Sequence, residues 1–134
     1  MIVRDLTSLD DDRTTDGGTW VSRRLLLARD GTRFSMHDTI LRAGTTTTMW
    51  YRHHVEAVYC VGGEGWLHDD EAGVRHALHE GVLYCLDGHE HHRVEAVTDL
   101  RMICVFDPPL VGGEVHDADG AYPLLGREVA EEAS

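Results

Sequence analysis

Hydrophobic and polar residues alternate in short runs along most of the chain, and glycine or aspartate closes many of these runs. Asp30-Gly31 between two such runs is a strong hairpin signal. We predict strands over residues 20–27, 34–41, 45–51, 56–61, 66–69, 74–78, 82–86, 92–97 and 100–106. Many short strands separated by turns indicate an all-β barrel or a two-sheet jelly roll.

Three segments fall outside this strand pattern. Residues 10–18 and 112–120 are polar or acidic and rich in turn residues, so both are predicted to be loops. Residues 126–134 form a polar tail, expected to be irregular or a short helix, which would be too short to be stable alone. With 134 residues in all, we predict one all-β domain over residues 1–125 followed by this tail.

Strand alternation places several polar side chains on faces that are otherwise apolar, because residues two apart share a face of a strand. Arg24 falls on the same face as Trp20, Glu56 on the same face as Val58, and Tyr84 on the same face as its apolar neighbours. Charged and phenolic groups are uncommon in a packed core. Their positions indicate a barrel interior that is lined for binding.

Composition and charge exclude several classes of function. The net charge of -12 repels phosphate backbones and anionic membranes, so we expect neither nucleic acid nor a membrane as a partner. All 12 basic residues are arginine, which excludes Schiff-base chemistry on a lysine and a lysine-tethered pyridoxal cofactor.

The cysteines and the terminal segments bear on location. The 3 cysteines lack C-x-x-C spacing, as expected for reduced thiols in the cytosol. The first residues lack the apolar run of a signal peptide, and no apolar stretch reaches the roughly 18 residues of a membrane span. We therefore expect a cytoplasmic protein.

Two partial motifs of cupin barrels suggest a metal site. Glu56 is followed by Gly63 at the spacing of the first cupin motif, and Gly81 is followed by His92 at the spacing of the second. The two histidines of the usual H-x-H pair are missing. Glu56, Tyr84 and His92 remain as a mixed oxygen and nitrogen donor set, which suits iron or zinc with open positions.

Structural roles are the alternatives for these three residues. Glu56 would form a strand-end salt bridge, Tyr84 would be a packing residue, and His92 would be a surface turn residue, as would His89 and His91. Five further histidines are not spaced along the chain as metal ligands are, and we expect them to be exposed to solvent: His53, His54, His68, His76 and His79.

An ordered set of short motifs resembles one known family. They include Met1-Ile2-Val3-Arg4, Trp20-x-Ser22-x-Arg24, His54-Val55-Glu56-Ala57-Val58, Tyr84-x-Leu86-Asp87-x-His89, Cys104-Val105-Phe106-x-Pro108-Pro109 and Glu114-Val115-His116-Asp117. From Met1 to about Leu125 the chain resembles the ectoine synthases, which are cupin-type enzymes. The resemblance implies a cupin-type jelly-roll barrel and a homodimer.

The same resemblance implies a reaction and a site. The reaction is the cyclisation of N-γ-acetyl-L-2,4-diaminobutyrate to the compatible solute ectoine with loss of water, by a hydro-lyase that carries Fe(II). The implied iron ligands are Glu56, Tyr84 and His92, although zinc and manganese accept the same donors. The implied substrate contacts are Trp20, Arg24, His37, Thr39, Tyr51, Cys104, Phe106, Glu114 and His116.

The chemistry of this cyclisation assigns roles to some of these residues. A metal ion would polarise the amide carbonyl, and Arg24 would bind the substrate carboxylate bidentately. We predict Glu114 as the general base and His116 or Tyr51 as the general acid. Residues 111–123 are the candidate lid that keeps water out.

Two other functions fit a cupin of this size. One is a non-catalytic cupin that binds a small ligand, as in the sensor half of a transcription regulator. The other is an iron-dependent cupin dioxygenase, whose usual 2-His-1-carboxylate ligands differ from the set found here.

Overall fold

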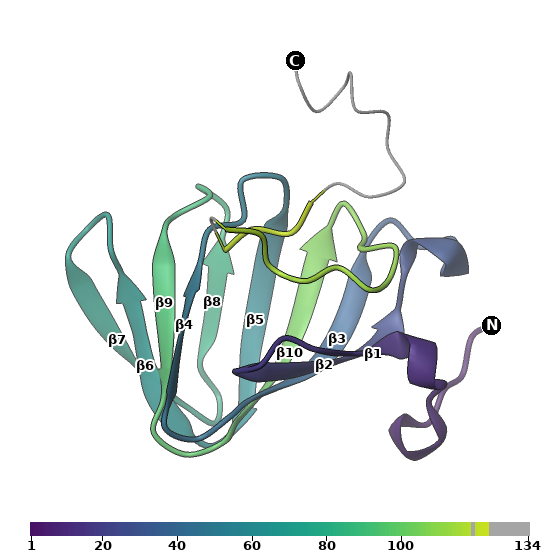
Figure 1. Cartoon of the computed structure of the whole chain (residues 1–134), viewed down its shortest axis with the longest axis horizontal. Coiled ribbons are helices and arrows are strands. Elements are labelled where there is room, and N and C mark those ends of the chain that lie inside the picture. Colours follow the sequence, from purple (N-terminus) through teal and green to yellow (C-terminus); the bar gives the residue numbers. More distant parts are fainter. Residues whose placement is uncertain (119, 124–134) are drawn as a thin grey trace.

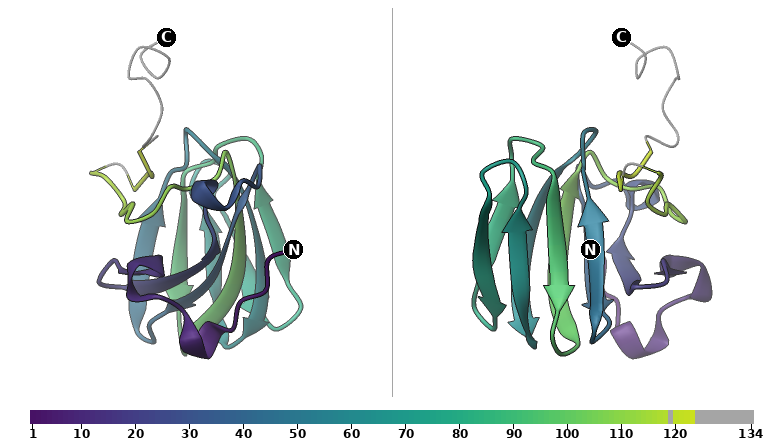
Figure 2. Two further views of the ribbon diagram at one scale, coloured as in Figure 1. Left: turned by 90° about the vertical axis from the view of Figure 1, so that its right-hand side faces the viewer. Right: turned by 60° about the vertical axis from the view of Figure 1, so that its left-hand side comes forward.

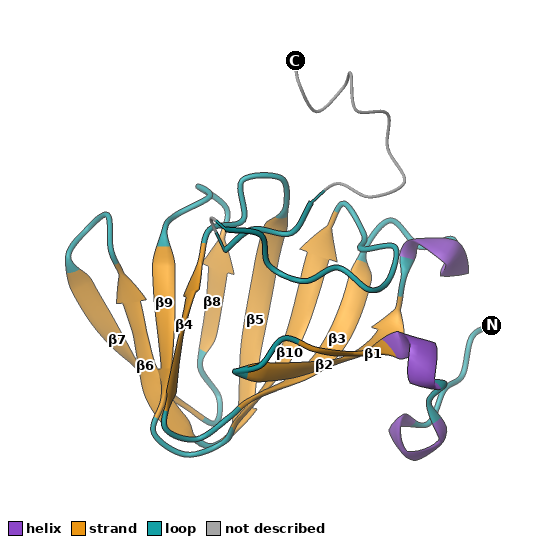
Figure 3. Cartoon of the chain, viewed as in Figure 1, coloured by secondary structure: helices purple, strands orange, loops and turns teal. Residues whose placement is uncertain are grey.

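The computed structural model describes residues 1–118 and 120–123. Strands dominate it, and its helices are single 3-10 turns (Figure 3). The strands are β1 (Thr14–Asp16), β2 (Trp20–Leu26), β3 (Ser35–Leu41), β4 (Thr45–Met49), β5 (Val55–Gly62), β6 (Glu64–Asp69), β7 (Val74–His79), β8 (Leu83–Leu86), β9 (His92–Ala96) and β10 (Leu100–Asp107). The 3-10 turns are η1 (Leu6–Ser8), η2 (Asp11–Arg13) and η3 (Ala28–Asp30). The predicted all-β class is confirmed.

The strands form two antiparallel sheets that face each other (Figures 1 and 2). The larger sheet has the order β1-β2-β3-β10-β5-β8, and the smaller has the order β4-β9-β6-β7. Strands distant in sequence lie side by side, because β10 inserts between β3 and β5. This arrangement agrees with the predicted cupin-type jelly roll.

Alternation along the strands fills the space between the sheets. Along β10, Met102, Cys104 and Phe106 are buried whereas Arg101 and Asp107 are exposed. Along β2, Trp20, Ser22 and Arg24 are buried, as their shared face predicted. The interior therefore contains the polar groups that the sequence placed there.

The strand boundaries agree with the sequence prediction to within two residues, and the region before β2 is the main difference. Residues 10–18 were predicted to be a loop, but they contain η2 and the edge strand β1, which pairs with β2. Thr14–Asp16 has no apolar alternation because it faces no core, so its sequence carries no strand signal.

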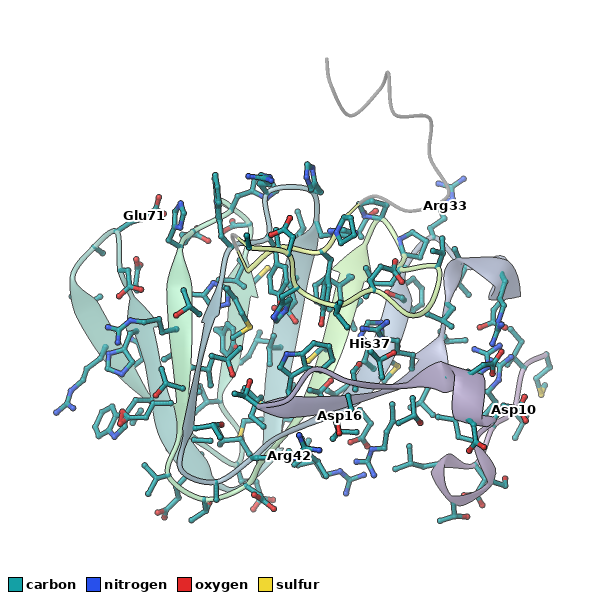
Figure 4. All side chains as sticks on the ribbon, viewed as in Figure 1. Asp10, Asp16, Arg33, His37, Arg42 and Glu71 are labelled. Carbon is teal, nitrogen blue, oxygen red and sulfur yellow. The ribbon has the colours of Figure 1, made fainter. Side chains whose placement is uncertain are left out.

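Ion pairs hold this N-terminal region against the larger sheet. Asp30 accepts hydrogen bonds from Arg4 and Arg13, and Asp16 pairs with Arg42 at an N–O distance of 2.7 Å (Figure 4). Over residues 1–118 and 120–123, no helix has the length and apolar composition that crossing a bilayer requires. The predicted tail, residues 126–134, lies outside the described residues.

Candidate active site

A small cavity of about 30 Å³ lies between the two sheets. That volume holds a water molecule or two. The cavity is lined by Trp20, His37, Thr39, Leu41, Met49, Tyr51, Glu56, Val58, Tyr84, Met102, Cys104, Phe106, His116 and Tyr122. The predicted site residues thus converge here, except Arg24, Glu114 and His92, which lie just outside the lining.

The larger sheet supplies one wall of the cavity through its strand register. His37 on β3 lies between Arg24 on β2 and Cys104 on β10, because it is the Cα partner of both. Glu56 on β5 is the partner of Phe106, and Tyr84 on β8 is the partner of Val58. All of these strands present alternate residues to the interior, so one face of the sheet gathers the polar groups.

Aromatic rings form the opposite wall, and two of them come from the C-terminal segment. The ring of Tyr122 stacks on Tyr51 at 5.2 Å between centroids and lies 4.5 Å from the ring of His116. The indole of Trp20 lies 5.2 Å from the ring of His116. Trp20 itself packs over Gly17, where a Cβ atom would come within 2.0 Å of the indole.

His116 and Tyr51 form a short hydrogen bond inside the cavity. The Tyr51 hydroxyl lies 2.6 Å from Nε2 of His116. Burial, together with the nearby His92 and Arg24, lowers the pKa of His116 to about 4, so its imidazole is neutral near pH 7. Burial raises the pKa of Tyr51 well above 10, which keeps the phenol protonated. The pair is a neutral base beside a neutral proton donor.

Arg24 and Glu114 contact each other outside the lining of the cavity. Nη2 of Arg24 donates to the backbone carbonyl of Glu114 at 2.6 Å, and Nη1 lies 3.8 Å from a carboxylate oxygen of the same residue. Arg24 is fully buried, and Nη1 has no hydrogen-bond partner among the described residues. A buried guanidinium N–H without an acceptor is costly, so Nη1 is available for an anionic ligand.

The carboxylate of Glu114 is also engaged by the backbone. Its two oxygens accept hydrogen bonds from the N–H groups of Val111 and Gly112, at 2.8 and 2.7 Å. The side chain therefore closes a tight turn in the C-terminal segment and faces Arg24. This geometry does not favour the general-base role predicted for Glu114, because the carboxylate does not line the cavity.

The C-terminal segment, residues 110–118 and 120–123, runs past one end of the two sheets (Figure 1), and its residues His116 and Tyr122 line the cavity. The N–H of Trp50 donates to the carbonyl of Gly120, and Arg52 lies 3.7 Å from Asp117. Gly120 has a φ of +76, and a Cβ atom there would lie 2.5 Å from the carbonyl oxygen of Thr48. Only glycine permits this approach. The bond from Trp50 also explains why β4 ends at Met49, two residues before the predicted strand end.

Two of the predicted metal ligands, Glu56 and Tyr84, line the cavity, and the third, His92, lies beside Tyr84. The ring of His92 lies 6.4 Å from that of Tyr84 and 5.7 Å from that of Tyr51. Nδ1 of His92 donates to the carbonyl of Glu90, whereas its buried Nε2 has no hydrogen-bond partner among the described residues. That tautomer leaves a lone pair on Nε2 for a ligand.

The surroundings of Glu56 are those expected of a metal ligand. Its side chain is buried, and none of the ion pairs among the described residues includes it. Burial raises the pKa of Glu56 to about 8. No three His, Cys, Asp or Glu side chains among the described residues cluster around one point. The candidate set contains two such side chains, and its third donor is a tyrosine.

Three histidines predicted to lie in solvent do not: His54 is buried, and His53 and His68 are partly buried. His54 is only 2% exposed, and its ring packs edge-on against Phe106 and Tyr122. His68 is partly buried beside Glu95, with 3.4 Å between Nε2 and a carboxylate oxygen. The spacing of histidines along the sequence does not predict whether each one is buried, because burial depends on packing against residues far away in the chain.

Tyr122 is the main wall residue that the sequence analysis did not select. It is 4% exposed, and the guanidinium of Arg24 lies 5.6 Å from its ring centroid. The available signal was an aromatic residue in an otherwise polar and acidic segment, in the run Ala121-Tyr122-Pro123.

Comparison with known proteins places these features in a family. The sequence model of the family described as Ectoine synthase matches residues 1–126. The L-ectoine synthase of Thermobifida fusca (strain YX) is 50% identical over 135 residues, which cover 98% of each chain. The L-ectoine synthase of Streptomyces anulatus is 48% identical over 131 residues, or 96% of this chain and 99% of that one.

Solved structures agree with the sequence relatives. A crystal structure of ectoine synthase from P. lautus is 50% identical with a TM-score of 0.84, covering 96% of this chain and 93% of that one. A RmlC-like cupin from Shewanella frigidimarina, at 22% identity, has a TM-score of 0.60 over 73% of this chain and 85% of its own, and shares the fold alone. The chain belongs to the ectoine synthase family of hydro-lyases.

Proposed function

We propose that the protein closes the ring of N-γ-acetyl-L-2,4-diaminobutyrate to give ectoine and water. The observation that carries this proposal is the convergence, in one cavity, of a neutral imidazole, a phenol and a buried carboxylate, beside an unpaired guanidinium N–H. An α-amine must attack an amide carbon of the same molecule, and the carbonyl oxygen must leave as water. Holding both groups in a small enclosed site accelerates such a step by proximity.

Arg24 is proposed to bind the substrate carboxylate through Nη1. The Glu114 backbone carbonyl and the Ser22 hydroxyl, which is 3.3 Å from Nε, fix the guanidinium plane. A fixed guanidinium loses little freedom when it binds a carboxylate. This contact would place the α-amine toward the aromatic wall.

His116 is proposed as the general base in place of Glu114. Its neutral Nε2 can take a proton that the α-ammonium group gives up, and Tyr51 can pass that proton on, since its hydroxyl is 2.6 Å away. When the carbinolamine breaks down, the same pair can return a proton to the departing oxygen. The α-ammonium nitrogen gives up two protons in all, one before it attacks and one after, and the carbonyl oxygen receives two and leaves as water, so the net products are ectoine and water.

A metal ion fits the polar side of the cavity. Glu56, Tyr84 and His92 would hold it, because a buried carboxylate lacks a counter-charge there and a buried imidazole nitrogen lacks a partner. We propose Fe(II), although zinc or manganese would accept the same oxygen and nitrogen donors. When bound, the ion would supply Lewis-acid polarisation of the amide carbonyl.

The small volume of the cavity implies that the substrate enters when the C-terminal segment moves. The substrate is much larger than the water or two that about 30 Å³ accommodates. Residues of the segment, His116 and Tyr122, form part of the wall. Opening there would admit the substrate, and closure would exclude bulk water from a dehydration.

Anaerobic turnover with added Fe(II) tests the proposal. The purified protein is incubated with the acetylated diamino acid, with and without Fe(II) and with and without oxygen, and ectoine is measured by NMR. We expect ring formation that needs the metal but not oxygen. A requirement for oxygen would indicate a dioxygenase, and an absence of turnover with retained binding would indicate a ligand-binding cupin.

Paired variants test the metal ligands. His92→Ala should lower bound iron and turnover together, by roughly a hundredfold or more. The matched control is His79→Ala, which removes an exposed histidine on β7. Normal iron content in His92→Ala would remove His92 from the metal site.

We also propose that the protein acts in the cytoplasm as a homodimer. Tyr59 and Leu83 support a contact between copies, because they are Cα partners on the outer face of β5 and β8 and are 47% and 63% exposed. Sedimentation equilibrium should give twice the chain mass, and a monomer at all concentrations would exclude the dimer.

A further inference from the structure

Ser35 occupies an unusual position next to the cavity. It is the first residue of β3, it is fully buried, and its hydroxyl has two neighbours among the described residues. The N–H of Leu110 donates to Oγ at 3.0 Å, and Nε2 of His37 lies 3.1 Å from the same oxygen. Neither contact belongs to the proton-transfer pair or to the proposed metal ligands.

The arrangement of these two contacts fixes the direction of the second one. A serine hydroxyl has one hydrogen and accepts through its lone pairs. The Leu110 backbone can only donate, so Oγ accepts there. If Nε2 of His37 also donated, the hydroxyl hydrogen would remain buried without an acceptor, which is costly. The hydroxyl therefore donates to Nε2, and the hydrogen of the neutral imidazole resides on Nδ1.

We propose that Ser35 is a positioning residue that holds His37 in the Nδ1–H tautomer, so that His37 offers a second donor beside Arg24 for the substrate carboxylate. His37 is 1% exposed, lines the cavity, and is the Cα partner of Arg24 across β2 and β3 (Figure 4). The tautomer follows from the hydrogen bonds alone, whereas the identity of the bound carboxylate rests on the proposed function.

The charge and burial of the surroundings support this assignment. Burial and the nearby Arg24 guanidinium lower the pKa of His37 well below its usual range, so its ring is neutral. Nη1 of Arg24 is buried without a hydrogen-bond partner among the described residues, and the hydrogen bond of the His37 ring to Ser35 uses Nε2, which leaves Nδ1–H to face a ligand. Two neighbouring N–H donors without an acceptor suit an anionic oxygen and disfavour an ammonium group. They would therefore orient the substrate with its carboxylate here and its amine at the other end of the cavity.

The direct test is the tautomer of His37 in the protein without substrate. Two-bond ¹H–¹⁵N correlation spectra of ¹⁵N-histidine-labelled protein distinguish protonated from unprotonated ring nitrogens, and His37→Asn identifies the His37 signals by their disappearance. We expect Nδ1 protonated and Nε2 unprotonated. The opposite tautomer in the unaltered protein would overturn the proposal, whether or not any variant folds.

Variants at Ser35 test its control over the tautomer. Ser35→Ala should raise the population of the Nε2–H form, and Ser35→Thr, which retains a hydroxyl, should restore the original tautomer. Ser22→Ala is the matched control, because Ser22 is an equally buried serine that contacts Arg24 instead of His37. An unchanged tautomer in Ser35→Ala would contradict the proposal.

Kinetics separate positioning from a merely structural role. Ser35→Ala loses the hydrogen bonds to both Leu110 and His37, and only the second positions a donor for the substrate. KM should therefore rise about fivefold while kcat changes less than twofold. Asparagine at position 37 carries an amide nitrogen as far along the side chain as Nδ1 and has no tautomers. In the His37→Asn background, Ser35→Ala should therefore cause no further rise in KM, whereas an additive rise would indicate a general loss of structure.

A protein with the expected tautomer but no turnover would refute the proposed function and leave the tautomer assignment standing.

Discussion

At the scale of single residues, burial decides the chemistry of the cavity more than direct ion pairing does. Glu56 has its pKa raised to about 8 and His116 has its pKa lowered to about 4, and in both cases desolvation is the largest cause. Each group is therefore driven toward its neutral form. A neutral imidazole keeps a free lone pair near pH 7, and a buried carboxylic acid can release its proton to solvent when a cation binds beside it.

Glu56→Gln should change how the stability of the metal-free protein depends on pH. Glu56 binds a proton more tightly in the folded state, so its contribution is present below pH 4.5 and is lost as the pH rises to about 8. Glutamine does not ionise, so the free energy of unfolding of Glu56→Gln should gain on the unaltered protein over that interval, by at most about 1.4 kcal/mol per pH unit.

Chemical denaturation in the presence of a chelator measures this difference. Glu71→Gln is the control, because Glu71 is exposed in the turn after β6 (Figure 4). Parallel stability curves for Glu56→Gln and the unaltered protein would show that the carboxylate is ionised in the folded state even without metal.

At the scale of elements, side chains rather than a sheet register hold the C-terminal segment. Consecutive N–H groups of Leu110, Val111 and Gly112 donate to Ser35 and Glu114. Arg24 binds the carbonyl of Glu114 from the opposite side. Glu114 thus connects the segment to the predicted carboxylate anchor, which is a positioning role.

Glu114→Gln should raise KM about tenfold and leave the acidic limb of the pH–rate profile in place. The amide keeps one acceptor and loses the other, so the turn and Arg24 are less well fixed, whereas His116 still provides the base. Steady-state kinetics between pH 3 and 9 measure both quantities, because the pKa of His116 is about 4. Disappearance of the acidic limb with an unchanged KM would instead identify Glu114 as the base.

Contact between the two sheets depends on a glycine in β6. A Cβ atom at Gly65 would lie 2.2 Å from the carbonyl oxygen of Glu95 and 2.7 Å from Cδ1 of Leu100. Gly65→Ala should therefore cost about 1–3 kcal/mol of stability or more. Gly62→Ala is the matched control, since a Cβ atom there meets nothing within 4 Å. Equal unfolding midpoints for the two variants would contradict this packing.

In the molecule as a whole, the two sheets form a rigid body, and the C-terminal segment that covers the cavity must open to admit the substrate. The strands are cross-paired throughout, with β10 bound on both sides by β3 and β5. The segment over the cavity has few backbone bonds to the sheets, of which one joins Trp50 to Gly120. Local opening is cheapest where backbone pairing is sparse.

Hydrogen exchange should locate the opening in the C-terminal segment. Amides of residues 113–118 and 120–122 should exchange faster than those of β10 in the free protein, and substrate should slow them selectively. Mass spectrometry of peptic peptides measures both rates. Faster exchange of the 70–73 turn with an unchanged C-terminal segment would show that the substrate enters elsewhere.

The sequence by itself determined the all-β class, most of the strands and the inward faces of Arg24, Glu56 and Tyr84. Two-residue alternation is a local property, so the residues of each strand indicate by themselves which side meets the core. The partial cupin motifs pointed to His92, and the family resemblance added Tyr51 and His116 to the candidate site. The rings of His92 and His116 both lie near that of Tyr51.

Only the tertiary structure decided which of these groups face one another. Arg24 meets a residue 90 positions away, His54 becomes buried through contacts with Phe106 and Tyr122, and Glu114 turns from the cavity toward its own backbone. Such contacts depend on how the sheets pack and where the last segment crosses them. No local period in the sequence encodes that arrangement, because it is set by the packing of residues far apart in the chain.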